Sequence, residues 1–125
     1  MTAIKEKEQN ITQEFFDLLS THDHEQVVVC NDNHTGLKAI IGIHNTVLGP
    51  GLGGTRMYPY KNDKDALIDV LRLSRGMSYK AAISGLNLGG GQVILIGDPN
   101  KHKSEAYFGE ICQFIDNVNS KYRLP

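Results

Sequence analysis

Apolar residues recur along the first half of the chain with the spacing of strands. A β-branched run at residues 26–30 and a second apolar run at residues 37–44 each predict a strand. Residues 31–36 lie between them and are rich in Asn, Asp and Gly, which favour tight turns. Two strands joined by such a segment predict an antiparallel hairpin near the N-terminus.

Three other segments carry apolar residues at helical spacing. They predict helices over residues 11–19, 64–77 and 104–118, the second of them capped by Asn62. Gly76 and Gly85 predict a break or a close helix contact after the second helix. Its expected inner face contains Leu67, Val70, Leu71, Ser74 and Met77. The expected inner face of the last helix contains Tyr107, Phe108, Ile111, Cys112, Ile115 and Val118.

Shorter apolar runs predict the remaining strands. Residues 53–58 and the fully apolar residues 93–96 favour strands, and residues 121–125 could start another. Helices alternating with strands, plus one hairpin, predict an α/β fold: a three-layer α/β/α sandwich with a mixed, mostly parallel sheet and an N-terminal antiparallel hairpin. The triple glycine at residues 89–91 predicts main chain that turns tightly or passes very close to another group.

Composition narrows the classes of function. A chain of 125 residues with 40% hydrophobic residues suits a single domain, residues 1–125. A net charge of -1, with no basic cluster and no long apolar run, argues against nucleic acid and membrane partners. Cys30 and Cys112 lie among apolar neighbours and predict buried free thiols in a cytoplasmic protein. His22 and His24 lack a third ligand, so a turn with solvated histidines is expected and no metal.

Two features suggest chemistry. Lys80 follows an apolar stretch, so its ammonium either extends to solvent or meets an anion in a cleft. The glycines at residues 49–54 match neither the dinucleotide fingerprint nor a phosphate-binding loop. Gly53 and Gly54 therefore indicate either close strand packing or main chain bared for a ligand, and the two can coexist.

These motifs together resemble a known family. The segments are Leu48–Met57 (LGPGLGGTRM), Leu71–Lys80 (LRLSRGMSYK), and Gly85–Gly91 (GLNLGGG) followed by VILIGDP. They look like the N-terminal, substrate-binding and dimerisation domain of the Glu/Leu/Phe/Val dehydrogenases, with the leucine enzymes nearest in pattern. The resemblance covers residues 24 to 122 and implies a homo-oligomer, a dimer or larger.

The resemblance implies reversible, NAD-linked oxidative deamination of an L-amino acid to its 2-oxo acid and ammonia. In the family, the lysine at the position of Lys80 grips the substrate carboxylate. Gly53, Gly54 and Met77 would line the substrate pocket, although Met77 could equally be a core residue. NAD would be bound by a Rossmann domain that this chain lacks, so no cofactor is expected within residues 1–125.

One position departs from the family pattern. The family places a catalytic acid/base lysine directly after the triple glycine, where this chain has Gln92. An amide hydrogen-bonds but exchanges no proton near neutral pH. The chain by itself is therefore expected to be inactive. Two readings remain open: the substrate-binding half of a leucine-type dehydrogenase, or a non-catalytic pseudoenzyme or assembly module.

Overall fold

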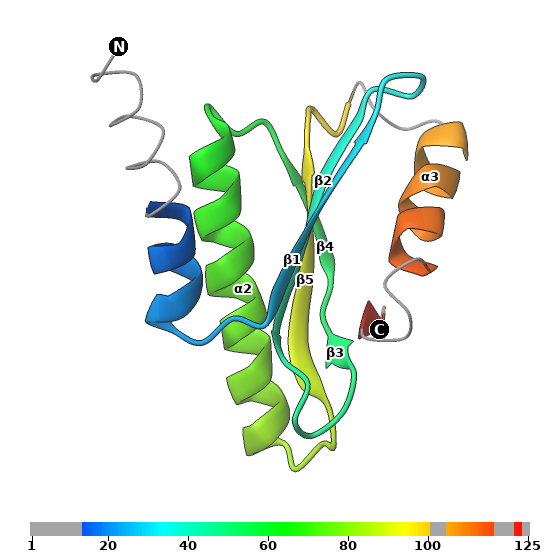
Figure 1. Cartoon of the computed structure of the whole chain (residues 1–125). Helices are drawn as coiled ribbons and strands as arrows, with labels where there is room; N and C mark the ends of the chain where they lie inside the picture. The colour runs from blue at the N-terminus through cyan, green and yellow to red at the C-terminus, as the bar shows by residue number, and fades with distance from the viewer. Residues whose placement is uncertain (1–13, 101–104, 117–121, 124–125) are drawn as a thin grey trace, which may run out of the picture.

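A computed structural model describes residues 14–100, 105–116 and 122–123. Within these ranges the elements are β1 (Gln26–Asp32), β2 (Leu37–Asn45), β3 (Gly51–Leu52), β4 (Thr55–Tyr58), α2 (Asp63–Ile83), β5 (Gly89–Ile96), α3 (Glu105–Asp116) and β6 (Tyr122–Arg123). A further helical segment covers residues 14–21. Figure 1 shows three layers: α2 and the segment at 14–21 cover one face of the sheet, and α3 covers the other. The predicted α/β sandwich is confirmed.

The sheet is mixed, with the strand order β1-β2-β5-β3-β6 and β4 also paired with β5. Antiparallel pairing joins β1 to β2 and β2 to β5. Parallel pairing joins β3 and β4 to β5, and β6 to β3. The predicted hairpin is the β1–β2 pair, in which Gln26 is opposite Ile43 and Asp32 opposite Leu37. The strand expected near residue 121 is β6.

The core divides into two clusters because strand side chains alternate between faces. On the α3 face, Val93 and Leu95 pack with Tyr107 and Ile111. On the α2 face, Ile94 packs with helix residues such as Val70. The predicted placement of Phe108 and Cys112 on the inner face of α3 is wrong. Phe108 is 49% exposed, and Cys112 is exposed. Only a narrow stripe of α3 meets the sheet, and Val118 lies outside the described residues.

Helix α2 is longer than predicted. Asn62 caps it as expected, with its Oδ1 accepting the Asp65 amide at 2.8 Å. The helix continues through Gly76 and ends at Ile83. The break occurs at Gly85, which has a φ of +70°. Leu86 N donates to Ala81 O and Gly85 N to Ala82 O, the paired bonds of a Schellman ending.

The triple glycine is not a bend. Residues 89–91 form the first part of β5, which the sequence placed only at residues 93–96. The strand expected over residues 53–58 divides into β3 and β4, with Gly53 and Gly54 between them. Main-chain contacts described below explain both differences.

A charged network ties β4 to α2. The Asp69 carboxylate accepts from Arg72 at 2.7 Å, from Tyr60, and from Arg56 in an ion pair at 3.3 Å. Burial, together with the hydrogen bond to the Asp69 carboxylate, raises the pKa of Tyr60 to about 12. Arg56 is the arginine of the glycine-rich segment, so this network fixes that segment relative to the helix. Across the described residues, no helix is both long and apolar enough to cross a membrane.

Candidate functional site

The glycines of the motifs allow main chain to approach main chain. A Cβ added at Gly53 would lie 1.6 Å from the Gly91 carbonyl oxygen and 3.3 Å from the Gln92 nitrogen. The Gly54 carbonyl accepts the Val93 amide at 3.0 Å. Gly53 and Gly54 therefore flank the backbone of Gln92. Both earlier interpretations of these glycines remain compatible, since Gly53 is tightly packed while Gly54 has open space at its Cβ position.

Gly90 brings α2 onto β5. A Cβ there would lie 2.2 Å from Ser74 O, 2.3 Å from Ser78 N and 2.4 Å from Ser78 Oγ. Gly42 on β2 also allows the helix to approach closely, because a Cβ added there would lie 3.0 Å from a methyl group of Val70. The helix thus rests against the sheet where β2 and β5 lack side chains.

Gln92 and Lys80 lie on the same side of the sheet. Gly90 contacts α2 and Ile94 packs against it, so by alternation Gln92 also faces α2. Its register partner Gly42 faces the same helix. Gln92 is only 7% exposed. The amide is therefore buried beneath the helix whose last turn carries Lys80.

Lys80 is exposed in the last turn of α2. Its Nζ makes no hydrogen bond or ion pair with any residue that the structure describes. A cation suits this position, since the C-terminal end of a helix carries partial negative charge. Met77, one turn earlier, is half-buried. The structure thus joins Gly53, Gly54 and Gln92 closely, and brings the end of α2 to the same strand at Gly90.

A cluster of histidine rings beside this helix was not predicted from the sequence. His24 and His44 stack edge to face, with ring centroids 4.7 Å apart. His24 Nε2 lies 2.8 Å from the Leu71 carbonyl, so the expectation of a solvated His24 is wrong. Its partners lie far apart in sequence, and no local spacing could have indicated them. Among the described residues, no group of three His, Cys, Asp or Glu side chains could hold a metal ion.

The pKa of His24 is lowered from its ordinary value. Burial is the largest cause, and His44, His22 and Arg75 add repulsion, while the bond to the Leu71 carbonyl opposes the shift. Because the carbonyl can only accept, Nε2 carries the proton and Nδ1 is bare. Nδ1 is buried without a hydrogen-bond partner among the described residues. A second proton would have no acceptor there.

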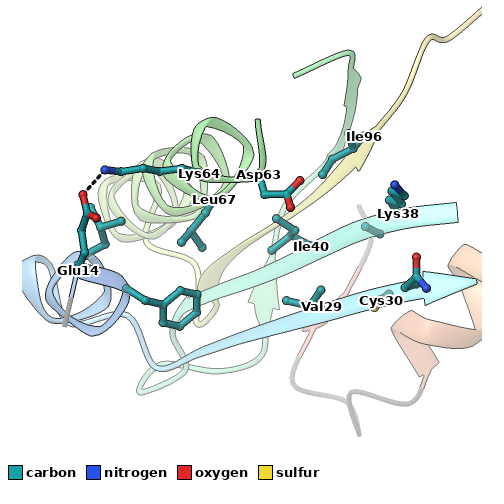
Figure 2. Close-up of a pocket in the computed structure, with 13 residues that line it drawn as sticks. Glu14, Val29, Cys30, Lys38, Ile40, Asp63, Lys64, Leu67 and Ile96 are labelled. Atoms are coloured by element: carbon teal, nitrogen blue, oxygen red, sulfur yellow. Dashed lines mark hydrogen bonds and ion pairs between the residues drawn. The ribbon is translucent and has the colours of Figure 1, made fainter. Parts of the chain in front are cut away.

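A cavity lies in another part of the domain. It has a volume of about 540 Å³ and is lined by Glu14, Phe15, Leu18, Val29, Cys30, Asn31, Lys38, Ala39, Ile40, Asp63, Lys64, Leu67 and Ile96. Figure 2 shows Lys64 reaching Glu14 at its rim, above the apolar side chains of Leu67 and Ile40. Its β5 residue is Ile96, at the opposite end of the strand from the glycines. None of the predicted site residues lines this cavity.

Comparisons with known proteins agree with the motifs. A model of the Glu/Leu/Phe/Val dehydrogenase dimerisation domain matches residues 24–123. Leucine dehydrogenase of Geobacillus stearothermophilus is 55% identical over 109 residues, which cover 87% of this chain and 30% of the relative. Phenylalanine dehydrogenase of Lysinibacillus sphaericus is 57% identical over 100 residues, 80% of this chain and 26% of the relative.

Solved structures show the same fold. L-tryptophan dehydrogenase from Nostoc punctiforme has a TM-score of 0.85 and 41% identity, covering 88% of this chain and 33% of that one. Glutamate dehydrogenase from Thermus thermophilus, at 20% identity and a TM-score of 0.61, shares the fold alone. The chain spans about a third of the length of the curated relatives that it matches.

We predict that Gly90→Ala destabilises the domain by about 1–3 kcal/mol, because the added methyl group would meet main-chain atoms of α2. Urea denaturation followed by circular dichroism measures this. Gly76→Ala is the matched control: it is exposed, has nothing within 4 Å and lies inside α2, so it should stabilise by about 0.5–1 kcal/mol. Equal midpoints for the parent and Gly90→Ala would contradict the contact.

We predict that His24 makes stability fall as the pH is lowered. Its folded pKa lies below the unfolded value of 6.5, so the unfolded chain binds the proton first. The free energy of unfolding should therefore decrease from pH 6.5 down through the folded pKa, and His24 should contribute no slope above pH 7.5. His24→Gln, which keeps a donor and cannot titrate, should show a shallower slope in urea titrations. If the pH dependence of the unfolding free energy is the same in His24→Gln as in the parent, His24 is not its cause.

Proposed function

This chain belongs to the Glu/Leu/Phe/Val dehydrogenase family, and we propose that it is the substrate-binding and oligomerisation half of an NAD-dependent, leucine-type amino-acid dehydrogenase. The observation that carries the proposal is the family match over residues 24–123, a range that contains both Lys80, in the last turn of α2, and Gln92, on β5. The matched domain is described as a dimerisation domain, which supports a homo-oligomer.

In this proposal Lys80 binds the carboxylate of an L-amino acid or 2-oxo acid. An exposed ammonium at a helix end is a flexible point charge suited to a carboxylate. Gly54 offers bare main chain beside β5, and half-buried Met77 would contact the substrate side chain. The cytoplasm is the compartment proposed for this metabolic role.

NAD does not fit the described part of this chain. The glycine-rich segment at residues 49–54 leads into β3 and β4 and not into the N-terminus of a helix. A dinucleotide phosphate site needs strand, glycine turn and helix in that order. NAD, which would supply hydride transfer when bound, is therefore assigned to a domain outside this chain.

Gln92 favours a second candidate, a non-catalytic binding or assembly module. Loss of a general acid/base typically costs about 10²–10⁴ in rate. With a nearly buried amide at this position, carboxylate binding through Lys80 would persist without turnover.

We predict that the chain binds 4-methyl-2-oxopentanoate and that Lys80→Ala weakens the affinity at least about tenfold, since a charged hydrogen bond contributes about 1.5–3 kcal/mol. Titration followed by two-dimensional NMR measures the affinity. Lys38→Ala, an exposed lysine of β2, is the matched control and should bind like the parent. Loss of binding in both variants, or in neither, contradicts the role of Lys80.

We predict that Gln92→Lys raises turnover about 10²–10⁴-fold in a protein that joins this chain to a dinucleotide-binding domain, by restoring the proton-exchanging group. NADH formation from leucine measures this, with Gln92→Met as a control of similar length that exchanges no proton. Normal turnover with glutamine would show that this position is not the acid/base. No gain with lysine would favour the non-catalytic module.

A further inference from the structure

His44 bridges two segments that are far apart in sequence. It is 8% exposed at the end of β2. Its Nε2 lies 2.8 Å from the His22 carbonyl, and its Nδ1 lies 2.7 Å from Ser78 Oγ on α2. The carbonyl can only accept, so Nε2 donates and the neutral ring has its lone pair at Nδ1. The Ser78 hydroxyl therefore donates a hydrogen bond to His44 Nδ1, and these two partners select the tautomer that carries its proton on Nε2.

Ser78 is also one of the residues through which α2 contacts the sheet. Its Oγ and its amide nitrogen lie 2.4 and 2.3 Å from the position where Gly90 would carry a Cβ. The serine side chain is thus held between the glycine strand and the His44 ring. A shift of this residue would move both contacts together.

Lys80 lies two residues after Ser78, in the last turn of the same helix. Helix ends fray unless side chains or tertiary contacts hold them. The Schellman bonds at Gly85 close the main chain beyond Lys80 but do not fix where the helix end lies over β5. The His44–Ser78 hydrogen bond does, because it joins the helix to β2, the neighbour of β5.

We propose that His44 is a positioning residue: by accepting a hydrogen bond from the Ser78 hydroxyl it holds the last turns of α2 at Gly90, and so fixes the position of Lys80 relative to β5. The inference rests on the proposed role of Lys80 as carboxylate ligand. In this proposal His44 acts through Ser78, by fixing the position of the helix end that carries Lys80. Neither the motifs nor the spacing of residues assigns His44 any part.

The test compares His44→Phe with His44→Asn in the full 125-residue chain. Phenylalanine keeps the ring and removes both hydrogen bonds, whereas asparagine places an amide near the Nδ1 position. Amide hydrogen exchange of residues 80–83, measured relative to the β2 amide of Ile41, reports the helix end independently of any ligand. We expect His44→Phe to speed exchange at the helix end about five- to tenfold relative to Ile41, as loss of a hydrogen bond worth about 1 kcal/mol implies. We expect His44→Asn to restore it.

A matched control disturbs the same ring cluster elsewhere. His24→Phe removes the bond to the Leu71 carbonyl but leaves Ser78 untouched, so relative exchange at residues 80–83 should remain at the parent value. A merely structural role for His44 would instead speed exchange uniformly, at Ile41 as at the helix end, and that result would overturn the proposal. If His44→Phe does not fold, Ser78→Ala decides by the same comparison.

Binding of 4-methyl-2-oxopentanoate separates this inference from the proposed function. His44→Phe should weaken it about fivefold, and His44→Asn should recover it. If the parent chain binds no 2-oxo acid, the proposed function fails while the exchange data still decide whether His44 positions the helix end. If the parent binds and His44→Phe binds equally well with unchanged exchange, the positioning role alone is wrong.

Discussion

The direct contact between the main chains of α2 and β5 is the constraint on which the rest of this domain depends. At Gly90 the helix approaches so closely that even a methyl group would overlap Ser74 and Ser78. Gly42 permits the same approach on the neighbouring strand. Because no side chain separates the two layers at Gly90, the main chain of the strand sets how closely α2 can approach the sheet there. The side chains of α2 extend from a helix held at that distance.

Much of the fold could be predicted because its signals are local. The hairpin follows from a β-branched run and a turn-forming segment, and the buried face of α2 follows from the spacing of Leu67, Val70 and Ser74. The end of α2 could not be predicted in this way. Gly76 costs a helix about 1 kcal/mol, yet the inner face continues to buried Ala81, and that packing outweighs the propensity.

The conformation of the triple glycine also could not be predicted from local sequence. A run of glycines indicates unusual backbone, but whether the backbone bends or extends depends on what lies across from it. Here Asn45 lies against Gly89 and helix α2 lies against Gly90. An extended strand is the conformation in which both can contact the glycines. For the candidate site, the motif residues Gly53 and Gly54 lie against the main chain on either side of Gln92, a contact between segments that the sequence alone does not show. The motifs could not reveal His44, because its partners come from a turn near residue 22 and from a helix more than 30 residues later.

The two cysteine thiols of this domain differ in their exposure to solvent. The thiol of Cys30 is enclosed on β1, and burial raises its pKa, whereas Cys112 is exposed on α3. Thiol-specific reagents act through the thiolate and need access, so they discriminate between the two without any mutation. A fluorophore or spin label would attach to the layer opposite Lys80. The protein as it stands thus carries a single native attachment point, from which oligomer assembly could be followed spectroscopically while the α2 face is left unmodified.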